Sequence, residues 1–256
     1  MSEHILSLSY GKDSIACIEA VKQLDYPLER IVHSEVWVTD NISADYPEMV
    51  EFKQYADKII KKRYGIEVEH LYATDKNGNK LTYEKLFYTK RIRGKYINQI
   101  YGFPMTKGAW CNDRLKANVL SQVNGVYYIG IAVDEIERVK RHQNKKNIML
   151  PLVDISWTEE DCYKWCESNN LLSPVYSNNK RGGCWFCHNM QITELRRLRN
   201  NYPNLWEILL KWDTDPPVSF KPNHTVHDFD KRFEMEDKKL VPTDRKFRWK
   251  MIEECK

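Results

Sequence analysis

The chain of 256 residues is long enough for one large α/β domain with a smaller appendage, and its 42% hydrophobic residues can form a substantial core. We expect no membrane span and no secretory signal, because no apolar stretch has the required length. The net charge of +4 does not by itself demand a nucleic-acid partner. Seven cysteines without an export signal are typical of reduced thiols in the cytoplasm, so we expect some of them to be ligands or core residues.

The first apolar run, residues 4–8, predicts a strand, and residues 13–24 predict a helix. Between them lies Ser9-Tyr10-Gly11-Lys12-Asp13-Ser14. A glycine turn that joins a strand to a helix is an anion site, because unpaired backbone N–H groups and the helix dipole attract phosphate. Here Lys12 adds a positive charge, Ser14 a hydroxyl, and Asp13 a carboxylate that can cap the helix or help to hold Mg²⁺. A corner that carries these residues by chance is the alternative.

Short apolar runs alternate with amphipathic stretches through the first half of the chain, which is typical of βαβ units and a parallel sheet. The expected elements, in chain order, are a strand at 31–38, a helix at 45–64, a strand at 66–72, helices at 81–95 and 111–123, a strand at 126–133 and a helix at 157–168. We therefore expect an α/β fold with a doubly wound, mainly parallel sheet.

Two basic runs stand out from this pattern. Residues 85–95 combine five Lys and Arg residues with Phe and Tyr, and residues 138–146 hold another five basic residues. Such runs suit phosphate backbones and stacked bases, and the alternative for each is a solvated charged face. Together they make a nucleic acid a candidate partner.

The character of the chain changes after Pro174. A polar loop leads to Cys184-Trp185-Phe186-Cys187-His188, and two short helices at 193–200 and 203–211 precede a charged, proline-interrupted tail. We expect a nucleotide-binding domain over residues 1–172 and a smaller, mostly helical region over 173–256 that carries the CxxC.

The pair Cys184-x-x-Cys187 is of the kind that binds zinc or an iron–sulfur cluster. Alone it does not separate metal binding from disulfide redox chemistry or chance. Cys111, at the start of the helix expected at 111–123, is a second candidate ligand. The cysteines spaced along predicted helices are expected in the core: Cys17, Cys162 and Cys166.

Several segments, in order, resemble a known family. The hexapeptide resembles the PP-loop (SGGKDS type) of the ATP pyrophosphatase superfamily, which cleaves ATP between its α and β phosphates, and differs from the GxxxxGK[ST] loop of kinases and GTPases. From near residue 5 to near residue 190 the chain resembles the phosphoadenosine phosphosulfate (PAPS) reductase-like branch of that superfamily. The segments that carry this resemblance, besides the loop, are 40–51, Trp110-Cys111-x-x-x-Leu115-Lys116, 130–138, 151–161 and Gly183-Cys184-x-x-Cys187. The resemblance implies the adenine nucleotide alpha hydrolase-like (HUP) fold.

Cluster-bearing members of that branch bind a [4Fe–4S] cluster through cysteines at these places, so the resemblance implies Cys111, Cys184 and Cys187 as ligands. Adenylyl-sulfate reductases have a cysteine pair at the first site, whereas Asn112 follows Cys111 here, which puts a fourth protein thiolate in doubt. One iron would then be open for a water, a sulfide or a substrate sulfur. A structural Zn²⁺ site that adds His188 is the alternative. Cys255 lacks the Gly-x-His that follows the catalytic cysteine of PAPS reductases, so we expect a tail cysteine without that role.

The resemblance leaves two enzymatic functions, a reductase of sulfate activated on an adenine nucleotide and an ATP-cleaving enzyme of sulfur incorporation. The reductases commonly lack the Lys-Asp pair, whereas Lys12 and Asp13 here can neutralise departing pyrophosphate. The family's Gly-Ile-Arg segment reads Gly130-Ile131-Ala132, so Arg138 or Arg141 would have to supply the missing arginine. Both features favour ATP cleavage that adenylates an acceptor, in tRNA thiolation or DNA phosphorothioation. A non-catalytic nucleotide-binding subunit with structural zinc is the third interpretation.

In the ATP-cleaving interpretation the loop binds the phosphates, with Lys12, Asp13 and Ser14 as the catalytic residues. Adenine would lie near Val38 and Asp40, at the carboxyl ends of the first strands. The remaining residues expected at the nucleotide are Ser9, Tyr10, Gly11, Gly130, Asp134, Glu135 and Arg138. The expected partners are ATP with Mg²⁺, a sulfur donor such as a desulfurase or sulfide, and nucleic acid at the two basic runs.

Overall fold

The structure is a computed structural model that describes residues 2–105, 108–178, 183–214 and 216–254. The described residues form two compact units. The sheet unit comprises Met1–Tyr83 and Cys111–Cys184, and the helical unit comprises Glu84–Trp110 and Trp185–Lys256. Residues 84–110 thus group with the C-terminal region, whereas the sequence analysis assigns them to the nucleotide-binding domain. The chain passes from one unit to the other within the CxxC.

A parallel sheet forms the centre of the sheet unit. Among the described residues it has five strands in the order β3-β2-β1-β4-β5. The strands are β1 (His4–Ser7), β2 (Arg30–Glu35), β3 (Val68–Tyr72), β4 (Val126–Tyr128) and β5 (Ile148–Met149). Leu6 of β1 pairs with Ile31 on one side and with Tyr128 on the other. The strand order reverses beside β1, and parallel sheets bind ligands at this kind of switch point, outside the carboxyl ends of the strands.

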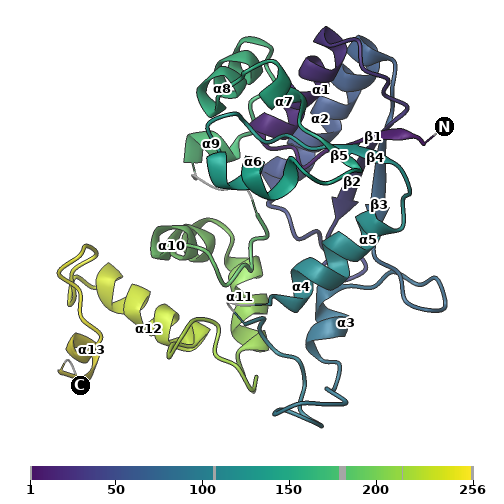
Figure 1. The fold of residues 1–256 in the computed structure, drawn as a ribbon. Helices are drawn as coiled ribbons and strands as arrows, with labels where there is room; N and C mark the ends of the chain where they lie inside the picture. Colours follow the sequence, from purple (N-terminus) through teal and green to yellow (C-terminus); the bar gives the residue numbers. More distant parts are fainter. Residues whose placement is uncertain (1, 106–107, 179–182, 215, 255–256) are drawn as a thin grey trace. The chain divides into compact units, whose positions relative to one another are not determined.

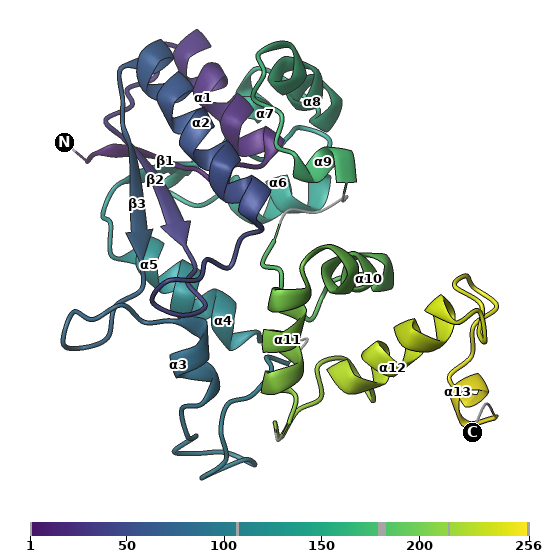
Figure 2. The same ribbon diagram turned by 180° about the vertical axis from the view of Figure 1, so that it is seen from behind.

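Helices cover both faces of this sheet (Figures 1 and 2). Neighbouring residues of a strand point to opposite faces, and on β2 His33 contacts Lys53 of α2 (Pro47–Tyr64) while Ser34 donates a hydrogen bond to the Leu115 carbonyl, 3.3 Å away. Leu115 belongs to a continuous helical segment made of α4 (Trp110–Asn112), the π-helical turn η1 (Asp113–Ala117) and α5 (Asn118–Ser121). The other helices of this unit are α1 (Lys12–Gln23), α6 (Ile136–His142), α7 (Pro151–Asp154), α8 (Glu159–Ser168) and α9 (Val175–Asn178). The predicted doubly wound α/β fold is confirmed.

The core of the sheet unit lies between α1, α8 and the strands. Cys17, Cys162 and Cys166 are fully buried in it, as predicted. The start of α8 is fixed by a capping box, in which Thr158 accepts from the Asp161 N–H and Asp161 accepts from the Thr158 N–H. Burial raises the pKa of the Cys162 and Cys166 thiols, which is the behaviour of inert core cysteines.

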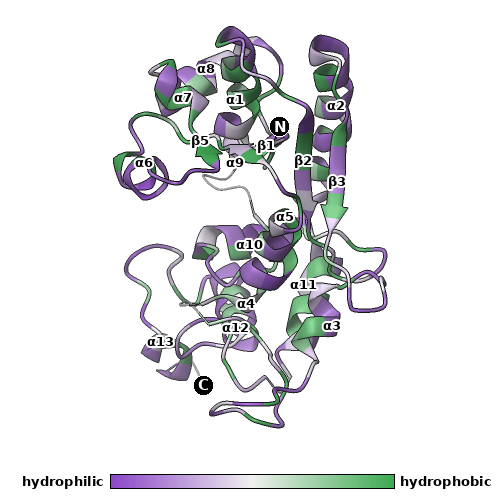
Figure 3. Cartoon of the chain, turned by 45° about the vertical axis from the view of Figure 1, so that its right-hand side comes forward, coloured by the Kyte–Doolittle hydropathy of each residue, from purple (hydrophilic) through white to green (hydrophobic). Residues whose placement is uncertain are grey.

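The helical unit contains α10 (Ile192–Asn201), α11 (Pro203–Trp212), α12 (Val226–Asp237) and α13 (Lys250–Glu254), together with most of α3 (Tyr83–Phe87). Hydrophobic residues of α11 (green in Figure 3) pack into an aromatic core. The buried aromatic side chains of that core are Phe87, Phe103, Trp185, Phe186, Trp212 and Phe220. None of the described helices combines the length and the apolar character that a membrane span needs.

Two predicted elements are wrong in extent. The helix expected at 81–95 is helical only in α3, because the chain turns after Phe87 and Lys90 then pairs with Ile100 across a loop in which Gly94 has a φ of 88°. The strand expected at 126–133 stops after Tyr128, where the chain turns and the Ile131 N–H donates to the Ile129 carbonyl at 3.0 Å. Strand β5 and helices α6, α7, α9, α12 and α13 are additions that the sequence analysis does not contain.

Candidate functional site

The predicted phosphate loop joins β1 to α1 and is closed by its own serines. The Ser14 hydroxyl donates to the Gly11 carbonyl at 2.9 Å and accepts from the N–H and the hydroxyl of Ser9 at 3.1 and 3.0 Å. Gly11 is the N-cap of α1. Because glycine has no side chain, the cap residue makes no side-chain hydrogen bond to the first turn of the helix. The Lys12 N–H donates to the Tyr176 hydroxyl at 3.0 Å, so an anion at the start of this twelve-residue helix would meet its positive dipole end and the N–H groups that follow Lys12.

The side chain of Tyr10 attaches this loop to α2 and β3. Its φ of 56° lies in the left-handed region that favours glycine, and its side chain is fully buried. The phenol donates to the Asp57 carboxylate and lies 3.2 Å from Nε2 of His70. His70 in turn contacts Asp57 at 2.9 Å and Glu35 at 2.8 Å. Tyr10 therefore holds the loop to α2 and β3, in the position where the common form of the motif has a second glycine.

The charge of this buried network is set by its contacts. Hydrogen bonds to Asp57 and Glu35 raise the pKa of His70 to about 9 despite its partial burial, so His70 is a cation near neutral pH. Burial, together with the Lys53 ammonium, lowers the pKa of His33 to about 3, so His33 is neutral. Its Nδ1–H donates to the Leu8 carbonyl at 2.8 Å, which leaves Nε2 to accept from Lys53 at 2.7 Å.

Because Gly130 has no side chain, the segment after β4 can approach the phosphate loop closely. A Cβ atom at this position would lie 2.5 Å from the Asp13 carbonyl oxygen and 2.7 Å from the Ser14 Cα, and both of these are backbone atoms. A side chain would thus displace the first turn of α1. Gly11 differs, since a Cβ there would meet its nearest neighbour, the Tyr176 hydroxyl, at an ordinary 3.4 Å.

Lys12 is held between two carboxylates. Its Nζ lies 2.7 Å from Oδ1 of Asp13 and 2.9 Å from Oε1 of Glu159. Burial favours the neutral amine, but these hydrogen bonds and charges outweigh it and raise the pKa of Lys12 above its ordinary value. Burial raises the pKa of Asp13, the Lys12 ammonium opposes this rise, and Glu135 and Glu159 add to it. Sequence reasoning missed Glu159, because an acidic residue in the first turn of a helix is usually explained by the helix dipole alone.

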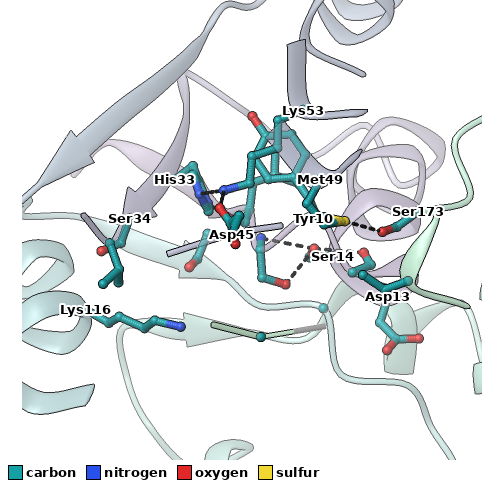
Figure 4. A pocket seen from close by; sticks show the side chains of 18 of the residues that line it. Tyr10, Asp13, Ser14, His33, Ser34, Asp45, Met49, Lys53, Lys116 and Ser173 are labelled. Atoms are coloured by element: carbon teal, nitrogen blue, oxygen red, sulfur yellow. Dashed lines mark hydrogen bonds and ion pairs between the residues drawn. The ribbon is translucent and has the colours of Figure 1, made fainter. Parts of the chain in front are cut away.

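A cavity of about 360 Å³ opens beside this loop, entirely within the sheet unit (Figure 4). The predicted residues that line it are Ser9, Tyr10, Gly11, Asp13, Ser14, Gly130 and Arg138. From the other side Lys53 reaches the cavity, bonded to His33 and paired with Asp45, while Lys116 of η1 extends its ammonium toward the middle of the view. Lys53 could have been found from the sequence, because it is a lysine on the buried face of α2 between Met49 and Ala56.

Other predicted nucleotide residues lie outside the lining, and Lys12, which was also predicted to be catalytic, is one of them. Val38 is fully buried and Asp40 is exposed, and the connection from β2 to α2 instead contributes Ser34, Val36, Ala44 and Asp45 to the cavity. Asp134 accepts from the Glu159 N–H at 3.0 Å, which ties the end of β4 to α8. Glu135 accepts from the Ala132 N–H at 3.2 Å and pairs with Arg138, so it orients the arginine that does line the cavity.

The predicted metal ligands are divided between the two units. Cys184 is half-buried and lines the same cavity as the phosphate loop, and Cys111 is half-buried elsewhere in the sheet unit. Cys187 is half-buried in the helical unit. Within either unit, the described residues contain no group of three His, Cys, Asp or Glu side chains that could hold a metal ion. The ligand set stays a prediction, and Cys255 lies outside the described residues.

His188 directly follows the CxxC and is buried. Its Nε2 meets no hydrogen-bond partner among the described residues. Burial, helped by the nearby Lys221 ammonium, lowers the pKa of His188, so the ring is neutral. A neutral imidazole with an unsatisfied nitrogen has the form of a zinc ligand, and the zinc alternative therefore remains open.

Comparisons with known proteins add little to this geometry. No protein-family model and no curated protein matches the chain. Among solved structures the chain is similar to the U34-tRNA thiolase NcsA from Methanococcus maripaludis, described with its [4Fe-4S] cluster, at 12% identity and a TM-score of 0.40. The match covers 90% of this chain and 80% of that one. A likeness this distant assigns neither family nor function, so the function must be inferred from the chain's own residues.

Proposed function

We propose that the protein cleaves ATP to AMP and pyrophosphate and adenylates an acceptor that then receives sulfur. One observation carries this proposal: the start of α1, the cationic side chains of Lys53, Lys116 and Arg138, and the Cys184 thiol all lie on one cavity. The cavity thus combines an anion site with a sulfur atom, and its volume is within the range of small-molecule sites, about 300–1,000 Å³.

The phosphates of ATP would bind at the start of α1, where backbone N–H groups and Ser14 face the cavity. An acceptor oxygen attacks the α phosphorus, and the bond from this phosphorus to the bridging oxygen breaks. Its electron pair leaves with pyrophosphate, so negative charge grows on the leaving group. Lys12 is fixed by Asp13 and Glu159 before the reaction starts, and a preorganised cation of this kind stabilises such charge most effectively.

Mg²⁺ fits this site through Asp13, whose carboxylate lines the cavity, because Mg²⁺ in nucleotide sites usually binds one or two carboxylates together with substrate phosphates. In the second step sulfur attacks the acceptor atom that carries the adenylated oxygen; the bond between these two atoms breaks, and AMP leaves with the oxygen and the electron pair. Arg138 and Lys116, which line the cavity, would bind the departing AMP phosphate.

By type, the thiols of Cys111, Cys184 and Cys187 suit an iron–sulfur cluster, because thiolates are the ligands that such clusters take, and the cluster itself is a proposal from the sequence. When bound through three thiolates, a [4Fe–4S] cluster supplies one open iron for sulfide. The donor of that sulfide, a nucleic-acid acceptor and a cytoplasmic location are parts of the same proposal.

The test is anaerobic purification with iron and acid-labile sulfide assays, followed by pyrophosphate release from ATP with and without tRNA or DNA. We expect iron and sulfide in the protein, and release that an acceptor accelerates. Protein that holds zinc and no iron would contradict the cluster. Turnover of adenylyl sulfate or PAPS without any release of pyrophosphate from ATP would instead identify a reductase.

A further inference from the structure

A second cavity of about 580 Å³ lies entirely within the helical unit. One wall is the loop that follows α3 and contributes Tyr96 and Met105, and the other wall is the segment 217–223. Apolar side chains form most of the lining, and Ser219 and Asn223 add polar groups. An apolar cavity with a few polar groups is the usual form of a site for a flat, partly polar ligand.

One contact joins the two walls of this cavity, and two hydrogen bonds join the second wall to the segment after Cys187. A Cβ on Gly102, whose φ is 62°, would lie 2.9 Å from Cδ of Pro217, so the loops are in direct contact there. Lys221 donates to the carbonyl oxygens of His188 and Met190 at 2.7 and 2.6 Å. These carbonyls belong to the segment that follows Cys187, and His188 itself lines the cavity. The cavity is therefore held next to the second cysteine of the CxxC.

The segment that contributes Tyr96 to this cavity is strongly basic. Residues 85–112 contain six Lys and Arg residues and no acidic residue, although the whole chain carries a net charge of only +4. In the loop that follows α3, Arg93 and Lys95 are exposed. The Lys95 ammonium lies 5.4 Å from the ring centroid of Tyr96, and the Arg91 guanidinium lies 5.3 Å from the same ring. A lysine and an aromatic ring in this arrangement suit a phosphate beside a stacked base.

We propose that this cavity receives an unpaired nucleobase of a nucleic acid, stacked on Tyr96, while Arg93 and Lys95 bind the flanking phosphates. Ser219 and Asn223 would then hydrogen-bond the edge of the base. A base inside a duplex cannot enter such a cavity, so the strand must be single or the base turned out of its stack. The inference rests on the proposed function, because that proposal names a nucleic acid as the acceptor.

The test is fluorescence anisotropy with labelled single-stranded RNA and DNA oligonucleotides of twelve residues, and with the matching duplexes, on the full chain without ATP. We expect single strands to bind more tightly than duplexes, and the tighter of RNA and DNA is the class of nucleic acid that this cavity takes. Tyr96→Ala should weaken binding by about fivefold to 100-fold, the usual effect of losing one stacked base, and Tyr96→Phe should restore it. Arg93→Glu with Lys95→Glu should weaken binding at least tenfold and flatten its salt dependence.

The matched control is Lys58→Glu with Lys62→Glu, which changes the net charge equally on the exposed face of α2. It should bind like the wild type, and the thermal unfolding of every variant is measured alongside. Equal binding by the wild type, Tyr96→Ala and the Arg93/Lys95 pair would overturn the inference, as would duplex binding as tight as single-strand binding. Pyrophosphate release by wild-type protein that binds none of these oligonucleotides would overturn it and leave the proposed function standing. Binding through Tyr96 without any pyrophosphate release would contradict the proposed function and support the base site.

Discussion

Tyr10→Phe isolates the hydroxyl that holds the phosphate loop. The substitution keeps the buried ring and the positive φ, and it removes only the hydrogen bond to Asp57 and the contact with His70. A hydrogen bond to a charged group contributes about 1.5–3 kcal/mol, and Asp57 keeps its bond to His70, so we expect a loss near the lower end of that range. For a chain of this size 1 kcal/mol corresponds to roughly 2–4 °C in Tm.

Differential scanning calorimetry of the wild type and Tyr10→Phe should therefore show a decrease of about 3–6 °C in Tm. Affinity for ATP should fall as well, because the loop loses its attachment to α2. Tyr26→Phe is the matched control, since the Tyr26 hydroxyl makes a contact of 3.4 Å with Asp154 away from the cavity. Equal Tm values for the wild type and Tyr10→Phe would refute the role given to this hydroxyl.

Three further predictions concern the same unit. Gly130→Ala should destabilise the protein by about 1–3 kcal/mol in urea unfolding, because its Cβ would crowd the backbone of α1, and it should also weaken ATP binding. Gly11→Ala should change the stability by about 1 kcal/mol or less. Equal losses of stability in the two variants would contradict backbone crowding at Gly130. Since His70 has a raised pKa of about 9, its contribution to stability is complete below its unfolded value of about 6.5 and is lost as the pH rises through 9. Unfolding free energies of the wild type and His70→Gln, measured from pH 6 to pH 10, should converge at high pH, and a constant difference would show that His70 is not charged. Cys184→Ala should lose most of the bound iron after anaerobic purification while Cys162→Ala keeps it, and equal iron in the two variants would remove Cys184 from the ligand set.

The strand–loop–helix start of the chain could be predicted because its signals are local. The apolar run, the glycine turn and the amphipathic helix lie within two dozen residues, and periodicity determines each of them. The role of Tyr10 could not be predicted, because its partners Asp57 and His70 are 47 and 60 residues away in the sequence. Only the fold brings α2 and β3 beneath the loop.

The missed helix α12 shows a different limit. Its charged residues suggested a solvated tail, yet Phe229 and Phe233 are buried, and Arg232 and Glu236 form a buried ion pair at 2.8 Å. The capping box of Thr225 and Asp228 was a local signal for this helix. The helix predicted for the segment after α3 is wrong for the opposite reason. Its lysines and arginines favour a helix, but Gly94 takes a positive φ and the chain turns back.

The CxxC could be identified from its spacing, but its place could not. Cys184 lies on the nucleotide cavity of the sheet unit, and Cys187, in the helical unit, directly precedes His188, which lines the second cavity. Spacing alone gives no information on which side of a unit boundary a residue lies.

Pyrophosphate release from ATP by the wild type and by Lys12→Ala, with Lys164→Ala as the control on the exposed face of α8, tests the central claim most directly. We expect Lys12→Ala to lose at least about 100-fold in rate, which is the usual effect of removing one preorganised charge-stabilising group, while Lys164→Ala retains the wild-type rate. Equal rates in Lys12→Ala and the wild type would contradict cleavage of ATP at this loop.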